Sequence, residues 1–141
     1  MAENYKTSEN ARLALRHRLY VAKESWGLQS ALRLAALSPG LFYVELHYEN
    51  GVPVGVILIQ HMVHTRKYRN VLGAQIFVRS AYRRRGIATK LLKSFVDPHP
   101  RRVRKICANK GVEGSQEFWR SHGVTPWFVP RNQPVEEWNY S

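Results

Sequence analysis

The spacing of apolar residues predicts helices in the first forty positions. Between Ala11 and Trp26 apolar residues recur every three or four positions, with basic residues on the opposite side, so we predict a helix over residues 9–26 that Ser8 caps. A second helix, rich in Leu and Ala, is predicted over residues 28–37 and ends before a Pro-Gly pair. The chain therefore opens with two consecutive helices.

The periodicity then changes to that of strands. Residues 41–48 and 54–61 are predicted strands, and Asn50-Gly51 between them is the strongest short signal for a hairpin. The second strand is apolar on both faces, and so is a third predicted strand at residues 71–78. Such strands are typical of the centre of a sheet that helices cover on both sides.

The rest of the chain alternates helices and strands. The predicted elements are a helix at 87–96, a strand at 104–109, a helix at 115–122 capped by Gly123, and a closing hairpin of 127–129 and 135–140. This order predicts an α/β fold, a central mixed sheet flanked by helices. The chain has 141 residues and shows no internal repeat or linker, so we expect residues 1–141 to form a single domain.

The composition is that of a folded globular protein, with 44% apolar and 23% charged residues. No apolar run approaches the ~20 residues of a membrane span, and the first residues do not resemble a secretory signal. Cys107 is the single cysteine, which excludes an internal disulfide and a cysteine-rich metal site. We therefore expect a cytoplasmic protein with no bound metal and no membrane association, and we leave its oligomeric state open.

The net charge is +12, and nearly all of it lies in one third of the chain. Residues 61–105 contain thirteen Lys or Arg and one acid, Asp97, whereas the segments on either side are close to neutral. A block of like charge repels itself, so its presence indicates an anionic ligand or partner. A solvated face that keeps the protein in solution is the alternative explanation.

A basic turn separates the third predicted strand from the helix that follows. It reads Arg83-Arg84-Arg85-Gly86-Ile87-Ala88, and Thr89 continues it into the helix. The first turn of a helix exposes unpaired N–H groups and carries partial positive charge, and a glycine lets a phosphate approach the backbone. With three arginines beside it, this turn predicts a phosphate or pyrophosphate site. The Gly-rich motifs of Rossmann and P-loop proteins are absent.

This turn resembles the signature of the GCN5-related N-acetyltransferases, Gln/Arg-x-x-Gly-x-Gly/Ala between a central strand and a helix, and the predicted order of elements is similar too. The resemblance implies acetyl-CoA as the co-substrate. It implies that backbone N–H groups around the turn hold the pyrophosphate and that Phe77 and Val78 pair through their backbone with the pantetheine arm. The cofactor-binding residues expected at the turn are Arg83, Arg84, Arg85, Gly86, Ile87, Ala88 and Thr89.

A second match to the same family lies downstream. Asn109 follows the predicted fourth strand, as it often does in the family, and is expected to contribute to cofactor binding. Members then often carry a Phe-Tyr pair whose tyrosine protonates the departing thiolate, but this chain has Trp119 at that position, and an indole does not titrate usefully. Either the thiolate leaves unassisted or Ser121, His122 or Tyr140 supplies the proton.

Three side chains are candidates for catalysis. His61 ends the second predicted strand and His64 begins the loop after it, near where the family binds its acceptor amine, and either imidazole is able to deprotonate that amine. Tyr140 is a candidate proton donor. An ordinary surface histidine pair is the alternative for His61 and His64, and Glu45 is either a base or a solvent-facing strand position.

The sequence predicts the acceptor only by its charge. Coenzyme A carries about four negative charges, far fewer than residues 61–105 can neutralise. The surplus indicates an acidic acceptor, for which RNA, tRNA or DNA, or an amine associated with them, is our preferred hypothesis. The alternatives are a non-catalytic nucleic-acid-binding module on the same fold and an enzyme of related fold that modifies a nucleobase.

Overall fold

The structure is a computed structural model that describes residues 2–21, 27–61, 72–98, 106–109 and 115–127. His64, Tyr140 and the predicted strand at 135–140 lie outside the described residues, as do the basic residues at 66–69 and 101–105. None of the described helices is both long and apolar enough to cross a membrane.

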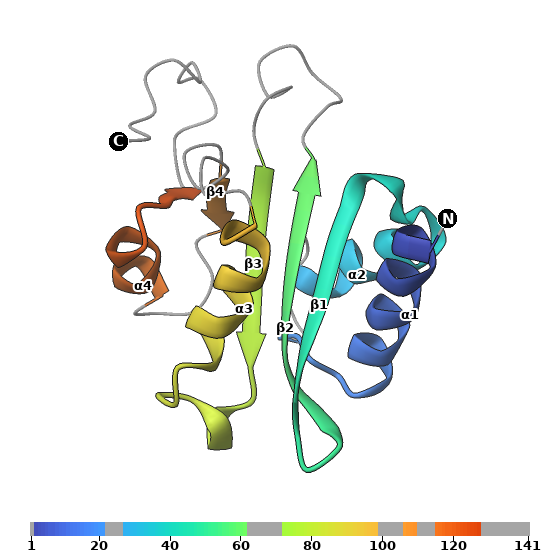
Figure 1. The fold of residues 1–141 in the computed structure, drawn as a ribbon, viewed down its shortest axis with the longest axis horizontal. Coiled ribbons are helices and arrows are strands. Elements are labelled where there is room, and N and C mark those ends of the chain that lie inside the picture. The colour runs from blue at the N-terminus through green and yellow to red at the C-terminus, as the bar shows by residue number, and fades with distance from the viewer. Residues whose placement is uncertain (1, 22–26, 62–71, 99–105, 110–114, 128–141) are drawn as a thin grey trace.

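The order of elements agrees with the predicted order as far as the description extends (Figure 1). The helices are α1 (Ala2–Arg16), α2 (Leu28–Leu37), α3 (Ile87–Val96) and α4 (Ser115–Ser121), with short 3-10 turns at η1 (Pro39–Leu41) and η3 (Ser80–Tyr82). The strands are β1 (Phe42–Glu49), β2 (Val52–His61), β3 (Leu72–Val78), β4 (Ile106–Asn109) and β5 (Thr125–Trp127). The bounds of α2 and α3 are the predicted ones.

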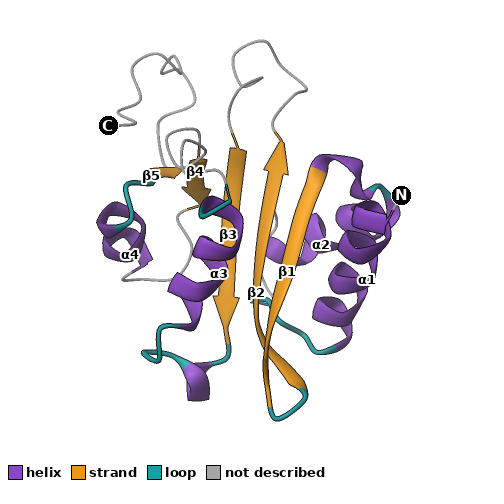
Figure 2. Ribbon diagram, viewed as in Figure 1, coloured by secondary structure: helices purple, strands orange, loops and turns teal. Residues whose placement is uncertain are grey.

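The strands form one mixed sheet in the order β1-β2-β3-β4-β5 (Figure 2). The first three strands are antiparallel, whereas β3 with β4 and β4 with β5 are parallel. The predicted α/β architecture, a mixed sheet flanked by helices, is confirmed. The predicted closing hairpin is described only as far as Trp127, which lies in β5 beside Asn109 of β4.

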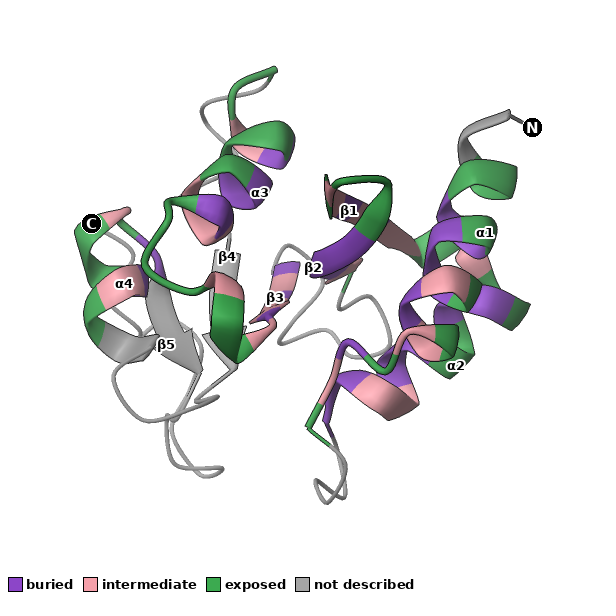
Figure 3. Ribbon diagram, turned by 90° about the horizontal axis from the view of Figure 1, so that it is seen from below, coloured by how far each residue is buried: buried purple, intermediate pink, exposed green. Residues whose placement is uncertain are grey.

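Two apolar clusters cover the two faces of the sheet, and buried residues line the helix sides that face the strands (Figure 3). One cluster joins α1 and α2 to β1 and β2, and the other joins α3 and α4 to β2 and β3. Ile57 and Ile59 belong to one cluster and Val56 and Leu58 to the other, and all four are fully buried. The two-sided apolar run of β2 therefore has the central position that the sequence predicts.

The first helix differs from the prediction of residues 9–26. It starts at Ala2 and ends at Arg16, because Arg18 adopts a left-handed conformation with φ 53°. The Leu19 N–H then bonds to the Ala14 carbonyl at 2.9 Å, which completes a Schellman turn and buries the Leu19 side chain. The apolar periodicity thus continues past the helix into its capping turn. The left-handed position is occupied by an arginine and not by a glycine, so the sequence does not indicate the end of the helix.

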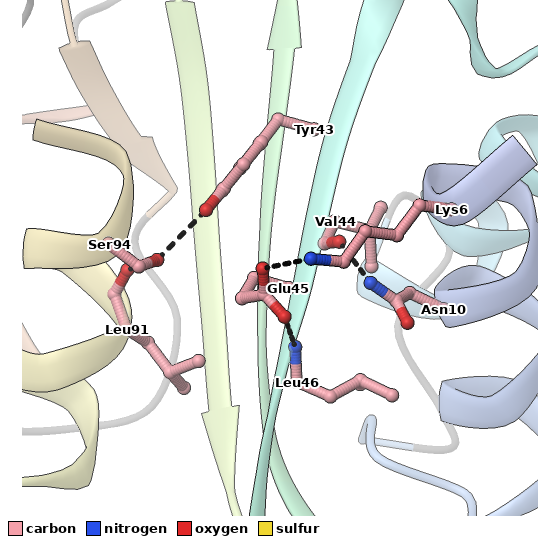
Figure 4. Close-up of polar contacts among 8 residues, drawn as sticks. All are labelled: Lys6, Asn10, Tyr43, Val44, Glu45, Leu46, Leu91 and Ser94. Atoms are coloured by element: carbon pink, nitrogen blue, oxygen red, sulfur yellow. Dashed lines mark hydrogen bonds and ion pairs between the residues drawn. The ribbon is translucent and has the colours of Figure 1, made fainter. Parts of the chain in front are cut away.

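Polar side chains of α1 join it to its neighbours instead of capping it. Ser8 lies inside the helix, and its hydroxyl donates to the Ala36 carbonyl at 2.7 Å, so the predicted cap is wrong. Asn10 donates through Nδ2 to the Val44 carbonyl at 2.8 Å (Figure 4). Both side chains are buried, so these bonds satisfy groups that would otherwise be costly to enclose.

Strand β1 makes polar contacts with helices on both sides of the sheet (Figure 4). Glu45 pairs with Lys6 of α1 at 3.5 Å, and the Tyr43 hydroxyl lies 3.0 Å from the Ser94 hydroxyl of α3. The hairpin that follows β1 has the predicted form, with Asn50 at φ 52° and Gly51 at φ 78°, the two positive angles of a type I′ turn.

Candidate active site

Strands β3 and β4 stay paired over only part of their length. Among the described residues, β4 pairs with Leu72–Ala74 and no strand pairs with Ile76–Val78 on that side. The other edge of β3 is paired with β2 along its whole length, from Leu72 opposite His61 to Val78 opposite Gly55. Within the part of the chain that the structure describes, Ile76–Val78 therefore have one open edge, directly before the basic turn.

The hydrogen-bond pattern shows which backbone groups face this edge. The Arg79 N–H donates to the Val54 carbonyl at 2.9 Å, so Gly55 and Val78 form a non-hydrogen-bonded pair of the antiparallel ladder. The N–H and C=O of Val78 therefore point away from β2, and by alternation those of Ile76 do too. The backbone of Phe77 points toward β2, so Ile76 and Val78, and not Phe77, present backbone groups on the other side, and the predicted pairing with a pantetheine arm stays a prediction.

The basic turn reverses the chain between β3 and α3 and presents the start of the helix. Arg84 and Gly86 both have positive φ, 66° and 78°, and the tight geometry at Gly86 is one that glycine adopts without strain. Gly86 caps α3 with no side-chain hydrogen bond, and the first helical bond of the backbone is from the Lys90 N–H to the Gly86 carbonyl. The N–H groups of the first turn therefore have no partner within the helix.

Arginine side chains order the segment between β3 and α3. Arg83 bends back so that its Nε donates to the Val78 carbonyl at 2.8 Å and its guanidinium lies 5.8 Å from the centre of the Phe77 ring. Arg85 lies 5.2 Å from the centre of the Tyr82 ring. Arg79 Nη2 donates to the His17 carbonyl at the end of α1. The side chains of Arg83, Arg84 and Arg85 remain exposed, so their charges face solvent beside the helix start.

A glycine in β2 allows α3 to lie close to the sheet. A Cβ added at Gly55 would lie 3.1 Å from Ile87 Cγ2 and 3.3 Å from Leu91 Cδ1. Ile87 is the first residue of α3, so this contact fixes the height of the helix start above the end of β3. By contrast, a Cβ added at Gly86 would meet nothing within 4 Å, which places open space in front of the turn.

The residue at the position of the family's tyrosine is part of the core. Trp119 lies in α4, is 3% exposed and belongs to the cluster beneath α3. Gly123 ends α4 with φ 76°, and the Val124 N–H bonds to the Trp119 carbonyl at 2.9 Å, so the predicted cap is confirmed. Packing in the core therefore accounts for Trp119.

The remaining predicted residues lie near the amino-terminal half of β3, before its open edge begins. His61 is exposed at the end of β2, opposite Leu72, which is ~13 Å along the strand from Ile76 at about 3.3 Å per residue. Asn109 is the last residue of β4, directly after the residue paired with Ala74, where the two strands separate. Glu45 is half-buried and paired with Lys6, which favours the structural alternative for it.

Sequence reasoning missed Ile76 and Gly55. Ile76 contributes backbone groups, so no side-chain motif identifies it, but two-residue alternation from Val78 would have found it. Gly55 was visible as a glycine inside an apolar strand, which is a signal for close approach of another element. The described residues contain no group of three or more His, Cys, Asp or Glu side chains arranged to hold a metal ion.

Solved structures with the same fold are acetyltransferases. An aminoglycoside acetyltransferase, AAC(6')-Iy, bound to a bisubstrate analogue, aligns over 84% of each chain with a TM-score of 0.57 and 17% identity. The unliganded aminoglycoside 6'-N-acetyltransferase AAC(6')-IG from Acinetobacter haemolyticus aligns over 84% of this chain and 85% of its own, with a TM-score of 0.53 and 22% identity. At these identities the similarity shows the fold alone. No curated protein sequence matches the chain significantly.

The sequence itself matches a family model across the same elements. The model, described as the acetyltransferase (GNAT) family, matches residues 9–124, from the middle of α1 to the end of α4 and its cap. The match contains the open edge of β3, the basic turn and the start of α3. The family resemblance and the enzyme class predicted from the sequence are thereby confirmed, and this chain belongs to the GNAT family of acetyltransferases.

Proposed function

We propose that this protein transfers the acetyl group of acetyl-CoA to a primary amine of an acidic acceptor associated with nucleic acid. The observation that supports cofactor binding most directly is the combination of two unpaired backbone surfaces. The open edge of β3 offers the N–H and C=O of Ile76 and the N–H of Val78, whose C=O already accepts from Arg83 Nε, and the start of α3 offers its first N–H groups. The two surfaces are consecutive in the chain, joined by the basic turn.

The chemistry of each surface matches a different part of the cofactor. The edge of a strand pairs with the amides of an extended arm, as in β-strand addition. The helix start, with Gly86 open in front of it and three exposed arginines beside it, suits a pyrophosphate. The residues present therefore fit coenzyme A, which supplies the acetyl group as an activated thioester.

The protein's part in the reaction is to orient and polarise. A backbone N–H on the open edge of β3 would polarise the thioester carbonyl as negative charge develops on its oxygen. The acceptor nitrogen forms the new C–N bond, the C–S bond breaks, and the nitrogen gives up one proton. We assign that proton to His61 or His64 through a chain of water molecules, because His61 lies ~13 Å along the strand from Ile76.

The positive charges of residues 61–105 support the proposal of an acidic acceptor. The described part of residues 61–105 has six cations, and none of them forms an ion pair with another described residue. These cations are Arg79, Arg83, Arg84, Arg85, Lys90 and Lys93. Aminoglycosides are polycations, and this surface would repel them. A nucleic acid or an amine attached to one is attracted by the same charges.

The cofactor site is tested by calorimetric titration of acetyl-CoA into the protein and into Gly86→Glu. The new carboxylate projects into the open space in front of the turn, where it repels the pyrophosphate, so binding should be abolished. Gly51→Glu is a matched control, because Gly51 has the same φ of 78° and the same open surroundings but lies in the β1–β2 hairpin. Loss of binding in both variants, or no binding by the native protein, would refute the site.

The acceptor is tested by measuring acetyl transfer to aminoacyl-tRNA and to an aminoglycoside at several salt concentrations. We expect transfer to the tRNA amine, with a KM that rises steeply with salt. Lys90→Gln with Lys93→Gln should raise that KM and leave the affinity for acetyl-CoA unchanged, whereas Arg16→Gln with Arg33→Gln, exposed cations of α1 and α2, should change neither. Preferred transfer to the aminoglycoside would contradict an acidic acceptor. Nucleic-acid binding without turnover would favour the non-catalytic alternative.

A further inference from the structure

A histidine directly after α4 contacts the helix start that the cofactor is proposed to occupy. His122 Nε2 lies 3.3 Å from the Thr89 hydroxyl, and Thr89 is the third residue of α3. Side chains in a helix lean toward its N-terminus, so the Thr89 hydroxyl lies over the first turn of α3. Both residues are half-buried, and the contact joins two helices that are far apart in sequence.

The hydrogen bonds of His122 assign its tautomer. His122 Nδ1 lies 2.9 Å from the Phe118 carbonyl, which can only accept, so Nδ1 carries the hydrogen. The neighbouring Ser121 hydroxyl donates to the same carbonyl at 2.7 Å and therefore has no hydrogen left for Nδ1. In the neutral ring Nε2 is then an acceptor, and its partner is the Thr89 hydroxyl.

The direction of this hydrogen bond depends on the protonation of His122. With a neutral ring the Thr89 hydrogen points at Nε2, and an anion at the start of α3 meets the lone pairs of the hydroxyl. With a protonated ring Nε2 donates to the Thr89 oxygen, and the hydroxyl hydrogen is free to donate to the anion. Protonation also adds one positive charge beside the helix start.

From this geometry we infer that His122 is a positioning residue that couples cofactor binding to proton uptake through Thr89. The inference rests on the proposed binding of the coenzyme A pyrophosphate at the start of α3. The charged groups of α3, α4 and the basic turn around this contact are Lys90, Lys93, Glu117, Arg120 and Arg83–Arg85. All are exposed, and none forms an ion pair with His122 among the described residues.

The charges around His122 explain why anion binding favours protonation of its ring. Because they are mostly cationic, a proton on His122 gains little without an anion nearby. A bound pyrophosphate brings the negative charge that stabilises the protonated ring and accepts the released Thr89 hydrogen. Binding should therefore take up part of a proton near neutral pH, and affinity should increase as the pH falls.

The experiment is calorimetric titration of dephospho-coenzyme A from about pH 5.5 to about pH 8.5. This ligand lacks the 3′-phosphate, a monoester that itself titrates near pH ~6 and would obscure the result. We expect the Kd of the native protein to fall about five- to tenfold toward the acidic end of this range. That is the change expected when one hydrogen bond at a half-exposed site gains a charge. Titrations in buffers of different ionisation enthalpy give the proton uptake directly.

Substitutions at His122 and Thr89 distinguish a role in coupling binding to proton uptake from a role in stabilising the fold. His122→Leu and Thr89→Val should each give weaker binding that no longer changes with pH, with helical content unchanged by circular dichroism. His122→Gln provides an amide that donates at any pH, so it should restore affinity without restoring the pH dependence. His47→Gln is the control, because His47 pairs with Glu49 at 3.1 Å on β1 and should keep the native profile.

The outcomes distinguish the inference from the function on which it rests. Native binding that does not change with pH, or an unchanged pH profile in His122→Leu, would overturn the role of His122 and leave the cofactor site intact. A full pH dependence in Thr89→Val would overturn the route through Thr89. Absence of binding at every pH would refute the proposed function and the inference with it.

Discussion

Gly55→Ala tests whether the closeness of α3 to the sheet determines both stability and cofactor affinity. The added methyl group would lie 3.1 Å from Ile87 Cγ2 and 3.3 Å from Leu91 Cδ1, so these side chains must move by a few tenths of an ångström. Ile87 and Leu91 are buried at 3% exposure each, in the cluster that joins α3 to β2. They have no free space into which to move without a shift of the helix.

Gly55→Ala should lower the free energy of unfolding by a moderate amount. Overpacking a core by one methyl group costs about 1–3 kcal/mol, and replacing a strand glycine recovers roughly 0.5 kcal/mol of backbone entropy. We therefore expect a net loss of about 1–2 kcal/mol in the free energy of unfolding, or a fall in Tm of roughly 3–8 °C for a chain of this size. Because Ile87 begins the helix whose N–H groups face the anion, the Kd for acetyl-CoA should rise a few-fold in the same variant.

The assay combines thermal melting by circular dichroism with calorimetric titration of acetyl-CoA. Gly40→Ala is the matched control, since a Cβ there meets nothing within 4 Å, and it should change the Tm by little. Gly55→Ala combined with Ile87→Leu removes the Cγ2 methyl group that the new side chain meets, so the second change should recover at least half of the loss. Equal stability of Gly55→Ala and Gly40→Ala would refute the reasoning.

Four further changes test other parts of the structure. Asn10→Ala removes the buried bond to the Val44 carbonyl and should lower the free energy of unfolding in urea by about 1–3 kcal/mol; an unchanged midpoint would contradict its structural role. Arg18→Gly relieves a left-handed residue at φ 53° and should raise stability by roughly 0.5–1 kcal/mol, measured in the same way. Trp119→Tyr should cost about 1–3 kcal/mol because it leaves space in the core and encloses a hydroxyl, and kcat should not increase; a tenfold gain would show that this position reaches the thiolate. Tyr140→Phe should lower kcat by roughly 100-fold with the Kd for acetyl-CoA unchanged, and a native kcat would remove Tyr140 as the proton donor.

The central elements were predictable because their residues combine two independent signals. Strand β2 is apolar from Val54 to Ile59 and follows Asn50-Gly51, so periodicity and turn chemistry agree. Helix α3 starts after a glycine and stops before prolines, and its predicted bounds are the observed ones. The end of α1 was not predictable in this way, since the residue in its left-handed position is Arg18 and the apolar Leu19 belongs to the cap.

In the candidate site, too, some residues can be identified from the sequence and others only from the fold. Gly86 and the arginines around it are visible in the sequence because a helix start that receives an anion needs a particular backbone and particular charges. The role of Ile76 depends on which way its N–H and C=O point, and that follows from the register with β2 and not from its side chain. The contact between His122 and Thr89 joins separate helices, so only the fold brings it together.

The contacts of the described residues narrow the choice of side chains that could protonate the departing thiolate. Trp119 is enclosed in the core and has no titrating group. The Ser121 hydroxyl donates to the Phe118 carbonyl within its own helix, and both ring nitrogens of His122 are engaged, one with that carbonyl and one with Thr89. Tyr140, the remaining donor that the sequence offered, lies outside the described residues, and a phenol with a pKa near ~10 is a suitable acid for a thiolate of slightly lower basicity. The thiolate should therefore depend on Tyr140 for its proton or leave without assistance, and the kcat of Tyr140→Phe distinguishes these two mechanisms.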